Sequence, residues 1–163
     1  MAQVDKIIFL KLKKKGLVEF PALYSVIVKW AKLNKYEIAE REYSDTFEKT
    51  TKSSKIEWDF TKKVDDYNKF LIKVKLNLRN YDIRKNAQKN LMNGELTIEF
   101  EGRIITDYED KWTKGPFYIF IRGIIDKFIT QPQREKLEAE LESDIKQTYN
   151  HIKDFLGSLK EKD

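Results

Sequence analysis

Three stretches between residues 56 and 104 alternate between apolar and polar side chains with a period of two. Successive side chains of a β-strand leave opposite faces of its sheet, so this pattern predicts three half-buried strands. An antiparallel sheet with one solvated face is indicated, and its apolar face needs a cover. The apolar positions are Ile56, Trp58, Phe60 and Val64, then Phe70, Ile72, Val74, Leu76 and Leu78, then Leu96, Ile98, Phe100 and Ile104.

The polar positions of these strands change the sign of their charge from one strand to the next. The middle strand is basic and both neighbours are acidic, at Lys69, Lys73, Lys75 and Arg79 against Glu57, Asp59, Glu99 and Glu101. In a meander the opposite charges meet across the strands, which predicts a self-neutralised, solvated face. A basic track for nucleic acid is the alternative interpretation.

The N-terminal part predicts one strand, one helix and an edge strand. Lys6 to Leu12 alternates as a strand, and Lys13 to Gly16 is expected to turn the chain. Pro21 suits the first turn of a helix, which we expect to end near Asn34. Its core stripe is Leu23, Val26, Ile27, Trp30 and Leu33. Residues 36–48 alternate poorly and are charged, as is typical of an edge strand.

The C-terminal part predicts a turn, a long connection and two helices. Asp65 to Asn68 has turn chemistry, and a polar connection is expected from Asn80 to Asn93-Gly94. Apolar residues from Phe117 to Ile129 recur at helical spacing, and a last helix runs from about Gln133 to Leu156, with Gly157 as its stop. The order β-α-β-β-β-β-α-α predicts a single α+β domain, a meander sheet of about five strands covered on one face by helices.

Two resemblances carry this pattern further. A long C-terminal helix on a curved antiparallel sheet resembles the helix-grip arrangement, which implies an apolar ligand between helix and sheet, although five strands are fewer than that family has. Lys62 to Tyr67, Asn93-Gly94-Glu95 and Asp107 to Ile129 (DYEDKWTKGPFYIFIRGIIDKFI) resemble small uncharacterised archaeal proteins. That second resemblance covers the C-terminal two thirds of the chain and implies no activity.

The composition indicates where the protein works and what kind of partner it could bind. The 163 residues include no cysteine, and no stretch approaches the roughly 20 apolar residues of a membrane span, so we expect a cytoplasmic protein without disulfides. The net charge of +5 is concentrated in residues 1–36, which hold eight lysines and two acidic residues. If the protein binds an anionic partner through charge, such as RNA or a lipid surface, the lysine cluster Lys11, Lys13, Lys14 and Lys15 is the place where we expect it. A solvated turn is the alternative interpretation.

The candidates for chemistry are few. The one histidine, His151, has no evident partner for acid–base work, and with no cysteine the usual zinc sites are not expected. The acidic corner Asp107, Glu109 and Asp110 lacks the spacing of a calcium loop and reads as solvated. We therefore expect a non-enzymatic protein without a cofactor or metal.

Three functional hypotheses remain open. The first is a binding domain for a small hydrophobic ligand between sheet and helices, lined by Trp58, Phe60, Ile72, Val74, Ile98, Phe100, Phe117, Phe120, Ile121 and Ile152. The second is an electrostatic module that uses the N-terminal lysines. The third is a homodimer that associates through residues 117–129.

Overall fold

The computed structural model describes residues 3–48, 51–65, 67–86, 89–106 and 130–160. Five long strands and two helices make up this part of the chain. The strands are β1 (Gln3–Val18), β2 (Glu37–Glu48), β3 (Thr51–Lys63), β4 (Asn68–Asn86) and β5 (Lys89–Thr106). The helices are α1 (Phe20–Leu33) and α3 (Thr130–Lys160). The helix predicted at residues 117–129 and the acidic corner Asp107, Glu109 and Asp110 lie outside the described residues.

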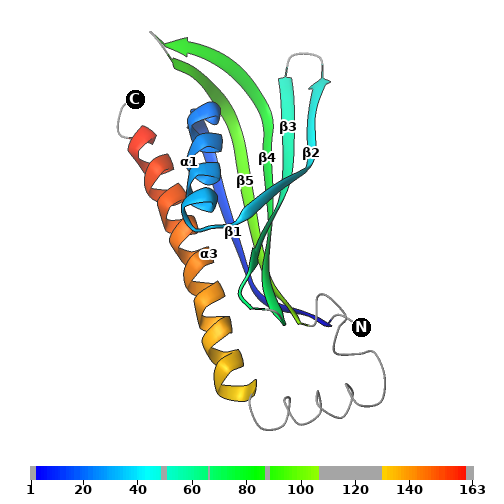
Figure 1. Cartoon of the computed structure of the whole chain (residues 1–163). Coiled ribbons are helices and arrows are strands. Elements are labelled where there is room, and N and C mark those ends of the chain that lie inside the picture. The colour runs from blue at the N-terminus through cyan, green and yellow to red at the C-terminus, as the bar shows by residue number, and fades with distance from the viewer. Residues whose placement is uncertain (1–2, 49–50, 66, 87–88, 107–129, 161–163) are drawn as a thin grey trace.

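The five strands form one antiparallel sheet in the order β1-β5-β4-β3-β2. β2 to β5 are the predicted meander, and β1 adds to it beside β5, so that β1 and β2 are the two edges. Both described helices lie on one side of the sheet, with α3 running along its length and α1 between α3 and the upper part of the sheet (Figure 1). The predicted α+β class and the edge position of residues 36–48 are confirmed.

Two segments that the sequence predicts as connections belong to strands instead. The turn expected at Lys13 to Gly16 lies inside β1, and the connection expected from Asn80 to Gly94 is mostly β4 and β5. The two glycines that suggested turns pair with each other, Gly16 opposite Gly94. A Cβ atom on Gly94 would lie 2.8 Å from the carbonyl oxygen of Arg79, next to the bulge in β4 between Arg79 and Asp82. Gly94 therefore accommodates a bulge rather than a turn.

The end of α1 is fixed by a Schellman motif. Lys35 adopts a positive φ of 65°, its N–H donates to the carbonyl of Lys32, and the N–H of Tyr36 donates to the carbonyl of Ala31. The Tyr36 ring stacks on Trp30 with 5.6 Å between centroids. This confirms the helix stop near Asn34. Of the predicted stripe, Leu23, Ile27 and Trp30 are buried, but Leu33 in the last turn is 73% exposed.

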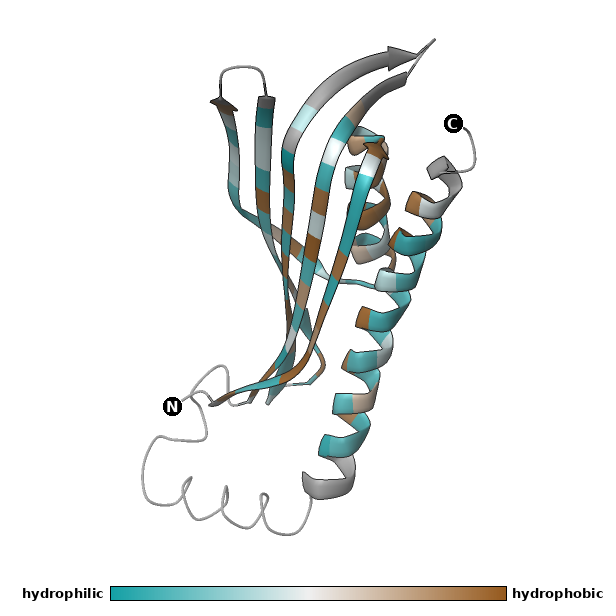
Figure 2. Cartoon of the chain, turned by 180° about the vertical axis from the view of Figure 1, so that it is seen from behind, coloured by the Kyte–Doolittle hydropathy of each residue, from teal (hydrophilic) through white to brown (hydrophobic). Residues whose placement is uncertain are grey.

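α3 is a mostly hydrophilic helix with one apolar stripe (Figure 2). The buried stripe is Leu141, Ile145, Thr148, Ile152 and Leu156. The helix runs on to Lys160, so Gly157 is not its stop. Nothing lies within 4 Å of the place where a Cβ atom on Gly157 would be, and a helical conformation at this exposed position costs a glycine only about 1 kcal/mol.

Candidate functional site

The face of the sheet that meets the helices, called the inner face below, is built from rows of residues paired across the strands. The six sheet residues that the sequence predicts as ligand lining belong to adjoining rows, and all are buried. The rows are Phe60–Ile72, Trp58–Val74–Phe100 and, one step further along the strands, Leu76–Ile98. Strand register therefore brings these predicted residues together. All six belong to the hydrophobic core.

The remaining predicted lining residues come from the helices. Ile152 of α3 is buried in the same core as the sheet residues. Phe117, Phe120 and Ile121 lie outside the described residues.

The two helices cover different parts of the inner face. Tyr24 of α1 packs edge-on against Trp58 of β3, with 5.3 Å between ring centroids. Tyr149 of α3 packs edge-on against Phe100 of β5, at 6.5 Å. α1 thus covers the β3 side and α3 covers the β5 and β1 side.

Two polar groups in this apolar layer have no hydrogen-bond partner in the described part of the structure. They are the indole N–H of Trp58, on the sheet, and the hydroxyl of Thr148, on α3. A buried polar group without a partner costs about 1–3 kcal/mol, because it gives up its hydrogen bonds to water. The inner face therefore contains two unpaired donors, one on β3 and one on α3.

Polar contacts hold α3 at a fixed distance from the rest of the fold. The hydroxyl of Tyr36 donates to Asp144 at 2.7 Å, and the indole N–H of Trp30 donates to Gln147 at 3.5 Å. Burial, then the hydrogen bond and charge of Asp144 and the charge of Glu140, raise the pKa of Tyr36 far above its usual value. Tyr36 is therefore a neutral donor at any physiological pH.

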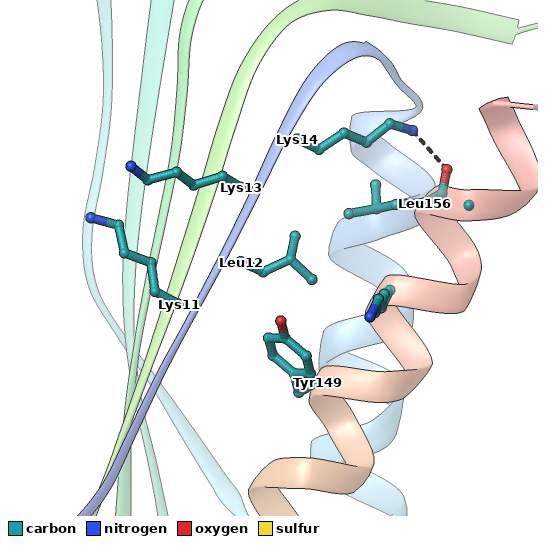
Figure 3. Close-up of a pocket in the computed structure, with 8 residues that line it drawn as sticks. Lys11, Leu12, Lys13, Lys14, Tyr149 and Leu156 are labelled. Atoms are coloured by element: carbon teal, nitrogen blue, oxygen red, sulfur yellow. Dashed lines mark hydrogen bonds between the residues drawn. The ribbon is translucent and has the colours of Figure 1, made fainter.

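A cleft of about 230 Å³ opens between β1 and the last turns of α3. It is lined by Lys11, Leu12, Lys13, Lys14, Tyr149, Lys153, Leu156 and Gly157. Leu12 and Lys14 point towards α3, whereas Lys11 and Lys13 run away from it on the other side of β1 (Figure 3). Because the side chains of a strand alternate, only Leu12 and Lys14 of β1 present their side chains to the cleft.

The cleft has an apolar wall and a cationic rim. Leu12 and Leu156 are buried, and Tyr149 is half-buried against Phe100. The Lys14 ammonium donates to the carbonyl of Leu156 at 2.7 Å and so caps the C-terminal part of α3 (Figure 3). Lys153 is exposed and has no carboxylate within 4 Å in the described structure. Lys153 and Lys14 thus place two ammonium groups beside an apolar wall.

The predicted lysine cluster is divided among different environments. Lys11 lies 3.6 Å from Glu99 and Lys15 lies 3.9 Å from Glu95, both on the outer face of the sheet. Lys14 is the helix cap, and Lys13 is exposed opposite Thr97. The four lysines therefore do not present one continuous cationic surface, and only Lys14 turns its side chain into the cleft.

The outer face has the alternating charges that the sequence predicts. Lys75 lies opposite Glu57 on one side and Glu99 on the other, and Lys73 lies in the same way between Asp59 and Glu101. A hollow of about 330 Å³ at this point is lined by Arg41, Glu57, Trp58, Asp59, Lys73, Val74, Lys75, Glu101 and Arg103. Acidic and basic groups alternate around it, so it favours neither an anion nor a cation.

Glu101 is the most strongly paired carboxylate of the outer face. It lies 2.9 Å from Arg103 and 3.2 Å from Lys6. Burial alone would raise the pKa of Glu101, but the hydrogen bonds and charges of Arg103 and Lys6 outweigh it and lower the pKa below its usual value. Glu101 is therefore a charged, structural partner at neutral pH.

Other candidates for chemistry find no support in the described residues. His151 is exposed on α3. No group of three or more histidine or acidic residues lies together in a way that would hold a metal ion, within the ranges that the structure describes. Nor is any helix there long and apolar enough to cross a membrane.

Comparisons of the chain with protein-family models, with curated proteins and with solved structures gave no match. Function therefore has to be argued from the geometry of the chain itself.

Sequence reasoning missed two features of the structure. One is the pairing of Lys14 with α3, because β1 and α3 lie at opposite ends of the chain. The other is a pair of exposed aromatic rings, Tyr43 and Phe47, on the inner side of β2. The poor alternation of residues 36–48 was the available sign of the second feature. Aromatic side chains that a strand leaves outside the core form an exposed apolar surface, which often marks an interaction site.

Proposed function

We propose that the protein is a non-enzymatic binding domain, and that it holds a small amphipathic anion in the cleft between β1 and α3. The apolar part of the ligand lies along Leu12, Tyr149 and Leu156, and its carboxylate or phosphate lies between the ammonium groups of Lys14 and Lys153. The observation that carries this proposal is the combination of an apolar wall and two lysines around one cleft.

This proposal combines the first two hypotheses drawn from the sequence. As in the first hypothesis, the ligand lies between sheet and helix, but none of the predicted lining residues that the structure describes lines this cleft. Its charged end uses Lys14, one of the N-terminal lysines. A cleft of about 230 Å³ is small beside the roughly 300–1,000 Å³ of typical ligand sites, so it favours a short ligand. The arrangement of a long C-terminal helix beside a curved sheet, in the manner of the helix-grip proteins, is consistent with this use.

Lys153 is the ammonium to change first. Lys14 also caps α3 through the carbonyl of Leu156, so its replacement would disturb the helix as well as the ligand. Lys153→Met keeps most of the apolar length of the side chain and removes only the charge. Lys136→Met is the matched control, because Lys136 is an exposed lysine on the same helix and does not line the cleft.

The test is isothermal titration calorimetry of the full chain with octanoate, and with octanol as the uncharged analogue. We expect octanoate to bind more tightly than octanol. An exposed ion pair contributes up to about 1 kcal/mol, so Lys153→Met should weaken octanoate binding about fivefold and leave octanol unchanged. Equal affinity for both ligands, or an equal loss in Lys136→Met, would contradict the proposal.

A further inference from the structure

The inner side of β2 carries two aromatic rings outside the core. Tyr43 and Phe47 are 53% and 70% exposed, although they occupy the strand positions that face inward. Tyr43 lies opposite the buried Ile56, and Asp45, between the two rings, lies opposite the buried Ser54. The three side chains therefore form an aromatic–acidic–aromatic surface, Tyr43–Asp45–Phe47, along one side of the strand.

Asp45 is held in place from the core. The hydroxyl of Ser54 donates to Asp45 at 2.6 Å, and the hydroxyl of Tyr81 lies 2.9 Å from that of Ser54. Because the single hydroxyl hydrogen of Ser54 goes to Asp45, Tyr81 donates to Ser54. Two buried hydroxyls thus support one exposed carboxylate, and they leave its second oxygen for another partner.

The carboxylates on this side of β2 are not neutralised. In the described structure neither Asp45 nor Glu40 has a lysine or arginine within 4 Å. The charges on the outer side of the same strand are paired, Arg41 with Asp59 at 2.7 Å and Glu42 with Lys55 at 3.8 Å. Burial, followed by the charges of Asp45, Tyr81, Glu40 and Tyr24, also raises the pKa of Tyr43, as expected beside uncompensated carboxylates.

One of the two rings, Phe47, already accepts a cation from within the chain. The ammonium of Lys52 lies over the Phe47 ring, 5.2 Å from its centroid. Aromatic faces attract ammonium and guanidinium groups through the ring quadrupole, and an adjacent carboxylate strengthens that attraction. The chemistry of the Tyr43–Asp45–Phe47 surface is therefore that of a cation site.

β2 is also an edge strand of the sheet. It pairs with β3 on one side, and no described strand pairs with it on the other (Figure 1). Five acidic residues and one arginine lie in β2, so a second β2 placed beside it would meet like charges. Such an edge discourages pairing with itself and favours an extended segment of opposite charge.

We infer that β2 is a docking edge for an extended basic peptide. The peptide pairs with β2 through its main chain, and alternate lysine or arginine side chains lie over Tyr43, Asp45 and Phe47. The period of two along the peptide matches the spacing of these three residues along β2.

The probe is a fluorescein-labelled peptide of alternating lysine and valine, measured by fluorescence anisotropy with the full chain. Asp45→Asn should weaken its binding about fivefold, and Tyr43→Ser or Phe47→Ser about two- to fivefold each. Lys52→Met should strengthen binding, because it frees the Phe47 ring. Glu42→Gln is the matched control: it removes one charge from the same strand on its paired outer side, and it should change binding little.

Two further comparisons distinguish strand pairing from the binding of free cations and from non-specific attraction by charge. A peptide N-methylated at alternate residues cannot pair through its main chain, and it should lose binding. If it binds as well as the parent peptide, β2 recognises only free cations and the inference is wrong. An equal loss in Glu42→Gln and Asp45→Asn would show non-specific attraction by charge, and would also overturn it.

Discussion

At the scale of single residues, the buried polar groups are the most informative part of the core. Two buried polar groups of the inner layer, the indole N–H of Trp58 and the hydroxyl of Thr148, have no partner in the described structure. Both residues are almost fully buried. By contrast, the buried hydroxyls of Ser54 and Tyr36 are paired, with Asp45 and Asp144 respectively. Each of the two unpaired donors is therefore expected to lower the stability of the fold.

Replacing Thr148 with valine tests this directly. The two side chains have the same shape, so Thr148→Val removes the hydroxyl without leaving a cavity. In ligand-free protein we expect the free energy of unfolding, from urea denaturation, to rise by about 1 kcal/mol, because an unpaired buried group is lost. Thr148→Ser keeps the hydroxyl and removes a methyl group, so it should lower the free energy of unfolding by about 1 kcal/mol. A loss of stability in the valine variant would show that the hydroxyl already has a partner.

At the scale of elements, periodicity predicted the three central strands and the two described helices, and the alternating charges agree with the observed order of the central strands. The basic strand between two acidic ones is the observed order of β3, β4 and β5. The lengths of β1, β4 and β5 were not predictable in the same way. Gly16 and Gly94 looked like local turn signals, but they face each other in a long ladder. Pairing over many residues outweighs the turn preference of a single glycine, and that pairing depends on segments far apart in the sequence.

Close packing of α3 on the sheet depends on another glycine. A Cβ atom on Gly102 would overlap Cδ1 of Ile145 and lie 2.9 Å from Cγ2 of Ile8. Gly102→Ala should therefore push α3 away from β5 and β1, and it should lower the free energy of unfolding by about 1–3 kcal/mol in urea denaturation.

Gly157→Ala is the matched change within α3. Nothing lies within 4 Å of the added methyl group, and alanine is the better helix former, so this variant should gain up to about 1 kcal/mol. Equal stability of Gly102→Ala and the unaltered chain would mean that α3 packs less closely on β5 than the structure has it.

At the scale of the whole molecule, charge is compensated face by face rather than along the chain. The excess of lysines in β1 suggested an exposed cationic segment, but Lys11 and Lys15 meet acidic residues of β5 that lie about eighty residues away in sequence. The two edges of the sheet keep opposite charges, with five lysines and one aspartate in β1 against five acidic residues and one arginine in β2. The site in the cleft could not be predicted from the sequence, because it depends on Lys14 meeting the last turns of α3.

The central claim is that the cleft between β1 and α3 binds an amphipathic anion, and native mass spectrometry of the freshly purified full chain tests it most directly. The measurement would be made before and after extraction with organic solvent, and again after octanoate is added. We predict a discrete added mass, which extraction removes and octanoate restores. In Lys153→Glu we predict that the added mass is absent, both in the freshly purified protein and after octanoate is added. A bare protein that takes up no octanoate, or an adduct of the same abundance in Lys153→Glu, would contradict the claim.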